Sequence, residues 1–290
     1  MPELPEVEVL CRRLDERCLG RTVSRVELAS IAALKSYAPP LGDLVGAEWL
    51  ACSRRGKYVC IELRRASAEQ AWLVINLARA GWVKWRPKLS VTTGRPGRGP
   101  LALRVGFDEG DGFEVTEMGH EKRLSIWTTA PSTIDGVSSL GPEPLDPDLT
   151  VELLGKILSA EKGDLKHALS RQSLIAGVGN AYSDEALNAA RLSPYKPCAN
   201  LSREELGALH EALTGVLRDA ITRSEGLDLD ELKDGKRSGM RVHGRTGLPC
   251  GTCGDTVREV SFATRSMQYC PTCQTGGKPL ADRRLSRLLK

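Results

Sequence analysis

The chain has 290 residues, of which 41% are hydrophobic and 27% are charged, and its formal net charge is +4. This length suggests about two domains. No apolar run approaches the ~18 residues of a membrane-spanning helix, and no signal peptide precedes the acidic start, so we expect a cytoplasmic protein. A net charge this small does not by itself indicate a nucleic-acid partner.

The chain begins with the residues MPELPE. Removal of Met1, which the small Pro2 permits, would leave a secondary amine at the terminus. A neutral amine is a nucleophile toward an aldehyde-like carbon, and an unperturbed α-amino group titrates near ~8. Glu3 and Glu6 lie on one side of a helix that starts here, as paired acid/base groups would. Alternatively, the prolines only begin a helix whose first turn favours acidic residues, and these six residues alone favour that interpretation.

Helical spacing of apolar residues predicts one helix over residues 3 to 19, ending at Gly20. From residue 22 to about 130 the pattern changes to short β-type runs that Gly or Pro mostly separates. Several strands at this spacing predict a β-sandwich or flattened barrel. The predicted strands are 23–28, 58–63, 72–77, 82–85, 101–107, 113–116 and 124–128.

The segment 131–150 contains four prolines and little periodicity, so we interpret it as an interdomain connection. Beyond it the pattern is helical, and a capping box at Ser202–Glu205 begins the last long helix. The predicted helices are 151–159, 165–170, 181–190 and 203–223. The fold class is therefore α+β multidomain. The predicted domains are a β-rich domain with a leading helix at 1–131, a linker at 132–149, a helical domain at 150–235, and a zinc hairpin with a basic tail at 236–290.

Two turns carry residues suited to phosphate. Gly177 and Gly179 permit a tight turn, and Asn180 can cap the next helix, so this helix start is a candidate anion site. A plain helix hairpin explains the same residues equally well. The RRGKY turn at 54–58 places Lys57 at the entrance to a strand, although a surface lysine is usually only solvated.

Four of the nine cysteines form the pattern C-x2-C, sixteen residues, C-x2-C, which matches a zinc ribbon. The expected ligands of one Zn²⁺ are Cys250, Cys253, Cys270 and Cys273. Four protein ligands leave no open position, so we expect a structural metal; two disulfides or four idle thiols are the alternatives. Strands at 257–262 and 267–269 would form a hairpin with Arg265 at its tip. The remaining cysteines fit a reducing compartment without chemistry: Cys11, Cys18, Cys52, Cys60 and Cys198.

Five stretches, in order along nearly the whole chain, resemble the formamidopyrimidine/endonuclease VIII family of DNA glycosylases. They are PELPEVE (2–8), RRGKY (54–58), IAGVGNAYSDEAL (175–187), VHGRTGLPC (242–250) and CPTCQ (270–274). The resemblance implies a β-sandwich with a leading helix, a helix-two-turns-helix domain and a zinc-ribbon hairpin. It also implies double-stranded DNA with a damaged base or abasic site as the partner, no membrane, a monomer, and association with a bacterial nucleoid.

The implied activity is that of a bifunctional DNA glycosylase/AP lyase of base excision repair. Pro2 would attack C1′ of the damaged nucleotide, expel an oxidised base and form a Schiff base, after which elimination nicks the strand. Glu3 would be the acid/base partner at the sugar, and Glu6 would support the site. The residues expected to clamp phosphates are Lys57, Lys166, Asn180 and Arg265. Of these, Lys57 is also expected to belong to the catalytic site. The alternative function is a non-catalytic damaged-DNA-binding protein of the same fold.

Two departures from the family pattern concern the substrate. Asn76 and Arg79 bound the stretch NLAR, where the family carries His-Leu-Gly-Met, so Arg79 replaces a methionine that fills the void left by the flipped base. In the stretch KRLS, Lys122, Arg123 and Leu124 stand for an Arg-Arg-Phe wedge. Leu124 would still wedge between bases, and the cations would bond the estranged base. These departures leave open the lesion, the opposite base and the number of elimination steps.

Overall fold

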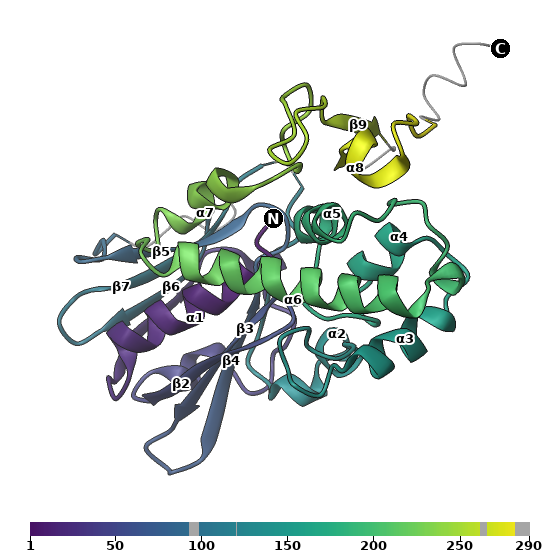
Figure 1. The fold of residues 1–290 in the computed structure, drawn as a ribbon. Helices are drawn as coiled ribbons and strands as arrows, with labels where there is room; N and C mark the ends of the chain where they lie inside the picture. The colour runs from purple at the N-terminus through teal and green to yellow at the C-terminus, as the bar shows by residue number, and fades with distance from the viewer. Residues whose placement is uncertain (93–98, 120, 262–265, 282–290) are drawn as a thin grey trace. The chain divides into compact units, whose positions relative to one another are not determined.

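The computed structural model describes residues 1–92, 99–119, 121–261 and 266–281 (Figure 1). The chain divides into two compact units. Unit 1 comprises Met1–Ser139 with Ser224–Gly235, and unit 2 comprises Leu140–Arg223 with Lys236–Lys290. Among the described residues, no helix combines the length and the hydrophobicity that a membrane crossing requires.

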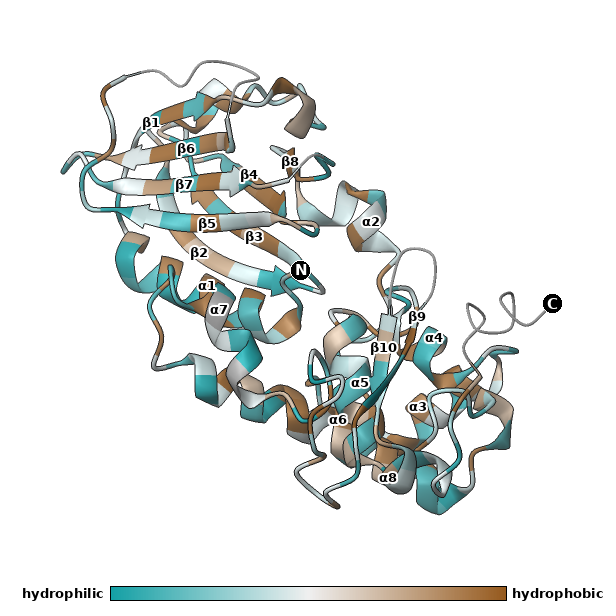
Figure 2. Cartoon of the chain, turned by 90° about the horizontal axis from the view of Figure 1, so that it is seen from above, coloured by the Kyte–Doolittle hydropathy of each residue, from teal (hydrophilic) through white to brown (hydrophobic). Residues whose placement is uncertain are grey.

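Unit 1 contains helix α1 (Leu4–Cys18) and two four-stranded antiparallel sheets, as the sequence predicted. Figure 2 shows hydrophobic residues recurring along the strands of both sheets. One sheet has the order β1 (Val23–Leu28), β6 (Leu101–Phe107), β7 (Gly112–Glu117), β5 (Gly81–Arg86). The other has the order β2 (Glu48–Arg55), β3 (Tyr58–Arg64), β4 (Gln70–Asn76), β8 (Ser125–Trp127).

Trp49 on β2 links three layers of unit 1. Its ring makes edge contacts with Phe107 and Phe113 of the other sheet, at centroid distances of 6.2 and 6.1 Å. Its indole Nε1 donates to Asp15 Oδ1 of α1 at 2.7 Å. Aromatic packing and one polar tether therefore fix α1 and both sheets around a common core.

The seven predicted strands are confirmed, with ends shifted by at most two residues. The prediction missed β2. A register shift between Trp49 and Ala51 interrupts its pairing with β3, so buried and exposed residues do not alternate along it. The sequence also gave no sign of the short helix α2 (Asp135–Ser138), because four residues are too few to show a period.

Residues 224–235, which we call the strap, return from unit 2 to unit 1 and include α7 (Leu232–Gly235). Leu229 and Leu232 are buried, and the buried Trp82 Nε1 donates to the Leu229 carbonyl at 2.9 Å. Arg12 of α1 pairs with Glu225 at 2.6 Å. Buried leucines, one indole hydrogen bond and a surface ion pair thus hold the strap to unit 1.

Unit 2 contains the four predicted helices and the predicted hairpin. The helices are α3 (Val151–Ser159), α4 (Leu165–Ser170), α5 (Asn180–Ala189) and α6 (Arg203–Ser224). The hairpin pairs β9 (Arg258–Ser261) with β10 (Ser266–Tyr269) and is followed by α8 (Pro271–Thr275). Arg265 and most of the basic tail lie outside the described residues.

Candidate functional site

The amino-terminal residues lie at the start of α1. Pro2 is buried, and Glu3 and Glu6 are only 2% and 1% exposed. Glu3 and Glu6 form a capping box, in which Glu6 Oε2 accepts from the Glu3 backbone N–H at 2.8 Å. Glu6 thereby orients the first turn of the helix, and Glu3 stands next to Pro2. This arrangement is compatible with a purely structural helix start and with a catalytic amine, because the hydrogen bonds that cap the helix also hold the two carboxylates near Pro2.

The Lys57 turn joins β2 to β3 in the same unit. Gly56 has a φ of +56°, which glycine adopts without steric cost, and Arg54 Nη1 donates to its carbonyl at 3.0 Å. Arg54 Nε also lies 3.1 Å from Glu8 Oε2 of α1, and the Arg54 side chain is only 8% exposed. This ion pair ties the turn that carries the half-buried Lys57 to the helix that begins beside Pro2.

Asn76 and Arg79 lie in the connection between β4 and β5, with Asn76 as the last residue of β4. Asn76 Oδ1 accepts from the Ala78 N–H at 2.9 Å, and Ala78 has a φ of +49°. That conformation is unfavourable for a residue with a Cβ, so the asparagine hydrogen bond stabilises the turn. Arg79 is exposed. The structure thus assigns Asn76 to shaping the turn and leaves Arg79 at its surface.

Leu124, the residue expected to act as the wedge, is buried in this structure. Lys122 and Arg123 are exposed, but Leu124 is 2% exposed. Leu124 packs into the interior of unit 1, so it would have to move outward before it could insert between bases. Sequence position alone could not distinguish a residue at the tip of this loop from one beneath it.

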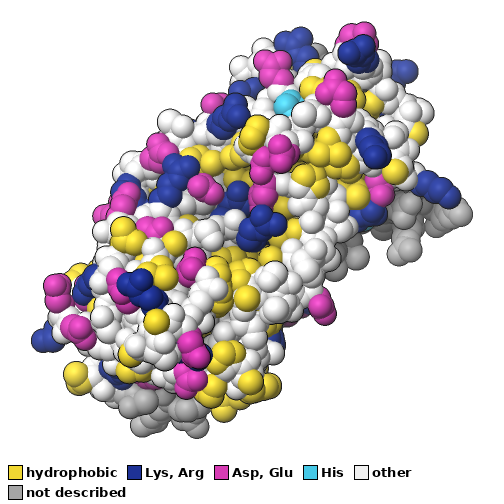
Figure 3. All heavy atoms as spheres, turned by 90° about the horizontal axis from the view of Figure 1, so that it is seen from below, with side chains coloured by type: hydrophobic (Ala, Val, Ile, Leu, Met, Phe, Trp, Pro, Cys, Tyr) yellow, Lys and Arg dark blue, Asp and Glu magenta, His cyan; other side chains and the backbone are white. Residues whose placement is uncertain are grey.

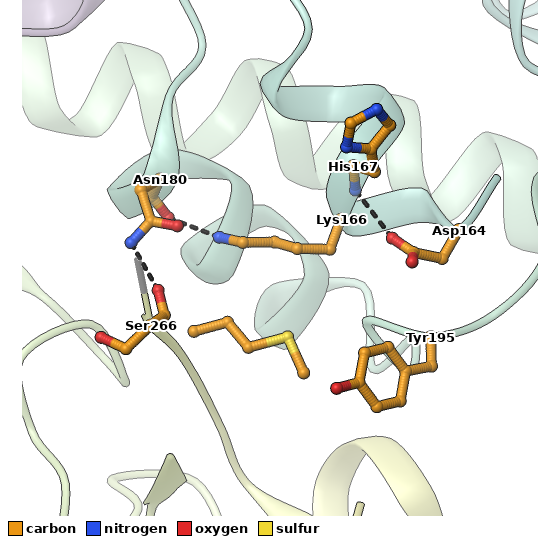
Figure 4. A pocket seen from close by; sticks show the side chains of 7 residues that line it. Asp164, Lys166, His167, Asn180, Tyr195 and Ser266 are labelled. Carbon is orange, nitrogen blue, oxygen red and sulfur yellow. Dashed lines mark hydrogen bonds between the residues drawn. The ribbon is translucent and has the colours of Figure 1, made fainter. Parts of the chain in front are cut away.

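Lys166 lies 7% exposed on α4, where it contacts α5 (Figure 4). Its Nζ donates to the Asn180 carbonyl at 2.6 Å, Ser183 Oγ at 2.8 Å and Asp184 Oδ1 at 2.5 Å. Three acceptors match the three N–H donors of an ammonium group. These contacts position the start of α5.

Asn180 connects α5 to the zinc hairpin. Its Nδ2 donates to the Ser266 carbonyl, the first residue of β10, at 2.7 Å. A cavity of about 100 Å³ opens here, and Figure 4 shows its polar lining. The residues that line it are Asp164, Lys166, His167, Asn180, Tyr195, Ser266 and Met267. The Asn180 amide thus ties the start of α5 to β10 beside this polar cavity.

Sequence reasoning missed the partners of two adjacent carboxylates on α5. Asp184 is fully buried, and its second oxygen lies 2.7 Å from His243 Nδ1. Glu185 accepts the backbone N–H groups of Arg241, Val242 and His243 at 2.7, 3.0 and 2.9 Å. The sequence signal that could have pointed to these contacts is the adjacent Asp-Glu pair within a helix that is otherwise rich in small and apolar residues. The partners from residues 241–243 lie more than 50 residues away, which no local pattern reveals.

The four cysteines of the repeated motif converge. Their Sγ atoms all lie within 4.8 Å of one another, with Cys253 and Cys270 at 3.4 Å and Cys250 and Cys273 at 3.9 Å. Tetrahedral Zn–S bonds of ~2.3 Å place sulfurs ~3.8 Å apart, whereas a disulfide requires ~2.05 Å. The geometry therefore fits one structural Zn²⁺ and excludes the two-disulfide alternative.

The remaining cysteines are buried and free. Burial raises the pKa of Cys18 and of Cys60 to about 12, and that of Cys198 to about 11. These thiols therefore stay protonated near neutral pH, and a protonated thiol is a poor nucleophile.

Charge on the visible surface does not mark a site. Figure 3 shows basic and acidic side chains interspersed over the face it displays. Mixed charge of this kind produces no strong field of one sign.

Three family models match successive parts of the chain. The formamidopyrimidine-DNA glycosylase N-terminal domain matches residues 1–118, the H2TH domain of the same family matches 140–229, and the zinc finger found in FPG and IleRS matches 247–276. The chain belongs to the formamidopyrimidine-DNA glycosylase family. This membership confirms the fold expected from the five sequence stretches.

One relative within this family matches nearly the whole chain, and another matches about half of it. The formamidopyrimidine-DNA glycosylase of Symbiobacterium thermophilum is 33% identical over an alignment of length 285, which covers 94% of this chain and 89% of the relative. A glycosylase-like protein of Mycobacterium tuberculosis is 57% identical over 152 residues, which are 52% of this chain and 95% of that protein.

Solved structures of the family share the same fold. MutM (Fpg) from Thermus thermophilus is 31% identical with a TM-score of 0.78, covering 96% of this chain and 100% of that one. Lactococcus lactis Fpg, non-covalently bound to DNA containing an AP site, is 25% identical with a TM-score of 0.80, covering 94% of this chain and 99% of that one.

Proposed function

We propose that this protein is a bifunctional DNA glycosylase/AP lyase that acts through the amine of Pro2 after Met1 is removed. The observation that carries the proposal is the buried Pro2–Glu3 start of α1, capped by Glu6, in a chain of the formamidopyrimidine-DNA glycosylase family. A protein that only binds DNA has no use for a nucleophilic amine at this position. Family membership supplies the substrate class, which is duplex DNA with a damaged base or an abasic site.

The reaction follows from the chemistry of the amine. Pro2 N forms a bond to C1′ of the damaged nucleotide as the C1′–base bond breaks, and the departing base takes up a proton. Opening of the sugar ring gives a Schiff base, with Glu3 beside it to transfer protons at the sugar. The iminium acidifies the adjacent C2′ proton, so its removal expels the 3′ phosphate and nicks the strand. Hydrolysis then releases Pro2.

The other residues hold DNA in this scheme. Lys57 sits on a turn tied to α1, and Asn180 sits at the start of α5, where amide and lysine donors suit phosphate oxygens. Arg265 is the third proposed clamp. Lys166 positions α5, and the zinc site makes the hairpin rigid. A substrate of chromosomal DNA also implies association with the nucleoid.

The lesion preference follows from the two loops that depart from the family pattern. Arg79 is exposed where the family methionine would stand, and Leu124 is buried where the family phenylalanine would stand. We therefore propose a preference other than 8-oxoguanine opposite cytosine. A panel of duplexes with oxidised purines, oxidised pyrimidines and abasic sites, each against four opposite bases, tests this.

Borohydride trapping tests the proposed chemistry. The mature protein should form a covalent adduct with abasic-site DNA. A variant with Met1 retained, in which the Pro2 nitrogen is part of an amide bond, should form none while still binding the DNA. The matched control is Pro5→Ala, which leaves the terminal amine intact. DNA binding without any adduct from the mature protein would instead favour the non-catalytic damaged-DNA-binding alternative.

A further inference from the structure

The described residues of the loop between β7 and β8 are 118–119 and 121–124, and one large apolar side chain among them is exposed. Met118 is 56% exposed, in contrast to Leu124 at the other end of the loop. Single exposed apolar residues are common, so exposure alone assigns no role. Here the neighbours also matter, because the exposed cations Lys122 and Arg123 belong to the same loop. A loop that carries both an exposed apolar side chain and cations has the composition of one that wedges into DNA.

Hydrogen bonds at the base of the loop fix where Met118 stands. The Met118 N–H donates to the Ala80 carbonyl at 3.2 Å, next to the turn that carries Arg79. The carboxylate of Glu117, which is 5% exposed, accepts the N–H groups of Arg123 at 2.7 Å and Leu124 at 2.9 Å. Both ends of the loop are therefore anchored at Glu117, and the loop lies beside the β4–β5 turn.

Leu124 is held beneath the loop. A Cβ placed on Gly81 would lie 2.9 Å from Leu124 Cδ1, so the leucine packs directly on the glycine at the start of β5. Moving Leu124 to the surface would leave a cavity in this packing. Met118 is consequently the accessible large apolar side chain among the described residues of the loop.

We propose that Met118 is the side chain that enters the base stack where the damaged nucleotide leaves it, with Arg79 and Arg123 beside it to bond the estranged base. The assignment rests on the proposed function. A methionine suits this role because its flexible, polarisable chain fills irregular spaces between aromatic surfaces. Met118 would thus take over the roles of the methionine and the phenylalanine that family members carry where this chain has Arg79 and Leu124.

The test compares base excision with reaction at an abasic site. Met118→Ala should lower the single-turnover rate of base excision from duplex DNA by about tenfold or more, because an unfilled stack favours return of the base. Its borohydride adduct with abasic-site DNA should stay within about twofold of wild type, since no base has to be extruded. Met118→Leu should restore excision.

A fluorescent base supplies a second measurement. With 2-aminopurine placed next to the lesion, binding of the wild type should raise the fluorescence by unstacking, and Met118→Ala should lose this rise. Val91→Ala, at an apolar residue of unit 1 that is 88% exposed, is the matched control and should behave like wild type.

Equal excision rates and equal fluorescence in Met118→Ala and wild type would overturn the assignment. So would a selective loss of excision in Leu124→Ala after correction for its folded fraction. Absence of any adduct with wild type would overturn the proposed function itself, a result distinct from an active wild type with an indifferent Met118.

Discussion

Lys166 and His243 bind opposite oxygens of a single buried carboxylate, that of Asp184. The lysine comes from α4, the aspartate from α5, and the histidine from the segment that leads to the zinc hairpin. One side chain therefore fixes three parts of unit 2 together. A buried charge with two cationic or polar partners is stable only while both remain in place.

Replacing Asp184 with Asn should destabilise unit 2 strongly. The substitution keeps the shape but removes the carboxylate charge that pairs with the buried Lys166 ammonium, which costs about 3–5 kcal/mol. Urea unfolding followed by circular dichroism measures the effect. Asp219→Asn, at an exposed position of α6, is the control and should change stability by less than about 0.5 kcal/mol. If adding Lys166→Met recovers none of the loss, the two side chains are not coupled.

Removal of zinc should weaken DNA binding without disturbing unit 1. A chelator releases the four cysteines, so the hairpin loses the bonds that hold its ends. DNA affinity should fall, and tryptophan fluorescence should not change, because all tryptophans lie in unit 1: Trp49, Trp72, Trp82, Trp85 and Trp127. Cys253→Ser should reproduce the effect and Cys198→Ser should not. Unchanged affinity after verified metal loss would separate the hairpin from DNA binding.

Leu124→Ala and Met118→Ala should differ sharply in stability. The leucine is buried, so its truncation leaves a cavity and costs about 2–4 kcal/mol. The methionine is more than half exposed, and its truncation should cost less than about 0.5 kcal/mol. Thermal unfolding followed by tryptophan fluorescence compares the two directly. Similar midpoints for both variants would contradict the burial of Leu124.

Trp82→Phe should loosen the strap. The substitution keeps most of the apolar contact and removes the indole donor to the Leu229 carbonyl, leaving a buried acceptor at a cost of about 1–3 kcal/mol. Limited proteolysis should then cut within residues 224–235 more readily than in wild type. Trp72→Phe, at a half-buried indole on β4, is the control. Identical cleavage patterns would show that this hydrogen bond does not secure the strap.

Acid should remove the stabilisation contributed by Glu114. Burial raises its pKa, but hydrogen bonds from Arg104 and Arg86 outweigh that effect and hold the pKa below the usual 4.5. Because the folded pKa is depressed, the contribution is complete above the ordinary carboxyl pKa and disappears as pH falls through the folded value. At neutral pH the wild type should unfold at a higher urea concentration than Glu114→Gln, and this difference in midpoint should shrink below about pH 4. An advantage independent of pH would argue against the ion pairs.

The sequence predicted most elements because their residues keep a regular period. Apolar spacing located α1 and α6, and β-branched runs located seven strands. It failed at β2, where the register shift at Trp49 removes alternation. The four cysteines were predictable as a site because metal coordination imposes their spacing.

Position within a motif was a weaker guide to exposure. Leu124 occupies the expected wedge position, but whether the loop folds over it depends on Glu117 and Gly81, which belong to other strands. The partners of Asp184 and Glu185 are equally distant in sequence. Tertiary packing, which no local pattern encodes, decided which residues of the candidate site face outward.

The strap has a practical consequence for dissecting the molecule. Because residues 224–235 complete unit 1, that unit is encoded by two stretches separated by helices of its neighbour. A fragment ending at Ser139 would lack the carbonyl that receives the Trp82 indole, together with the two leucines packed beside it. An autonomous version would have to join the two stretches directly, with an artificial linker in place of residues 140–223.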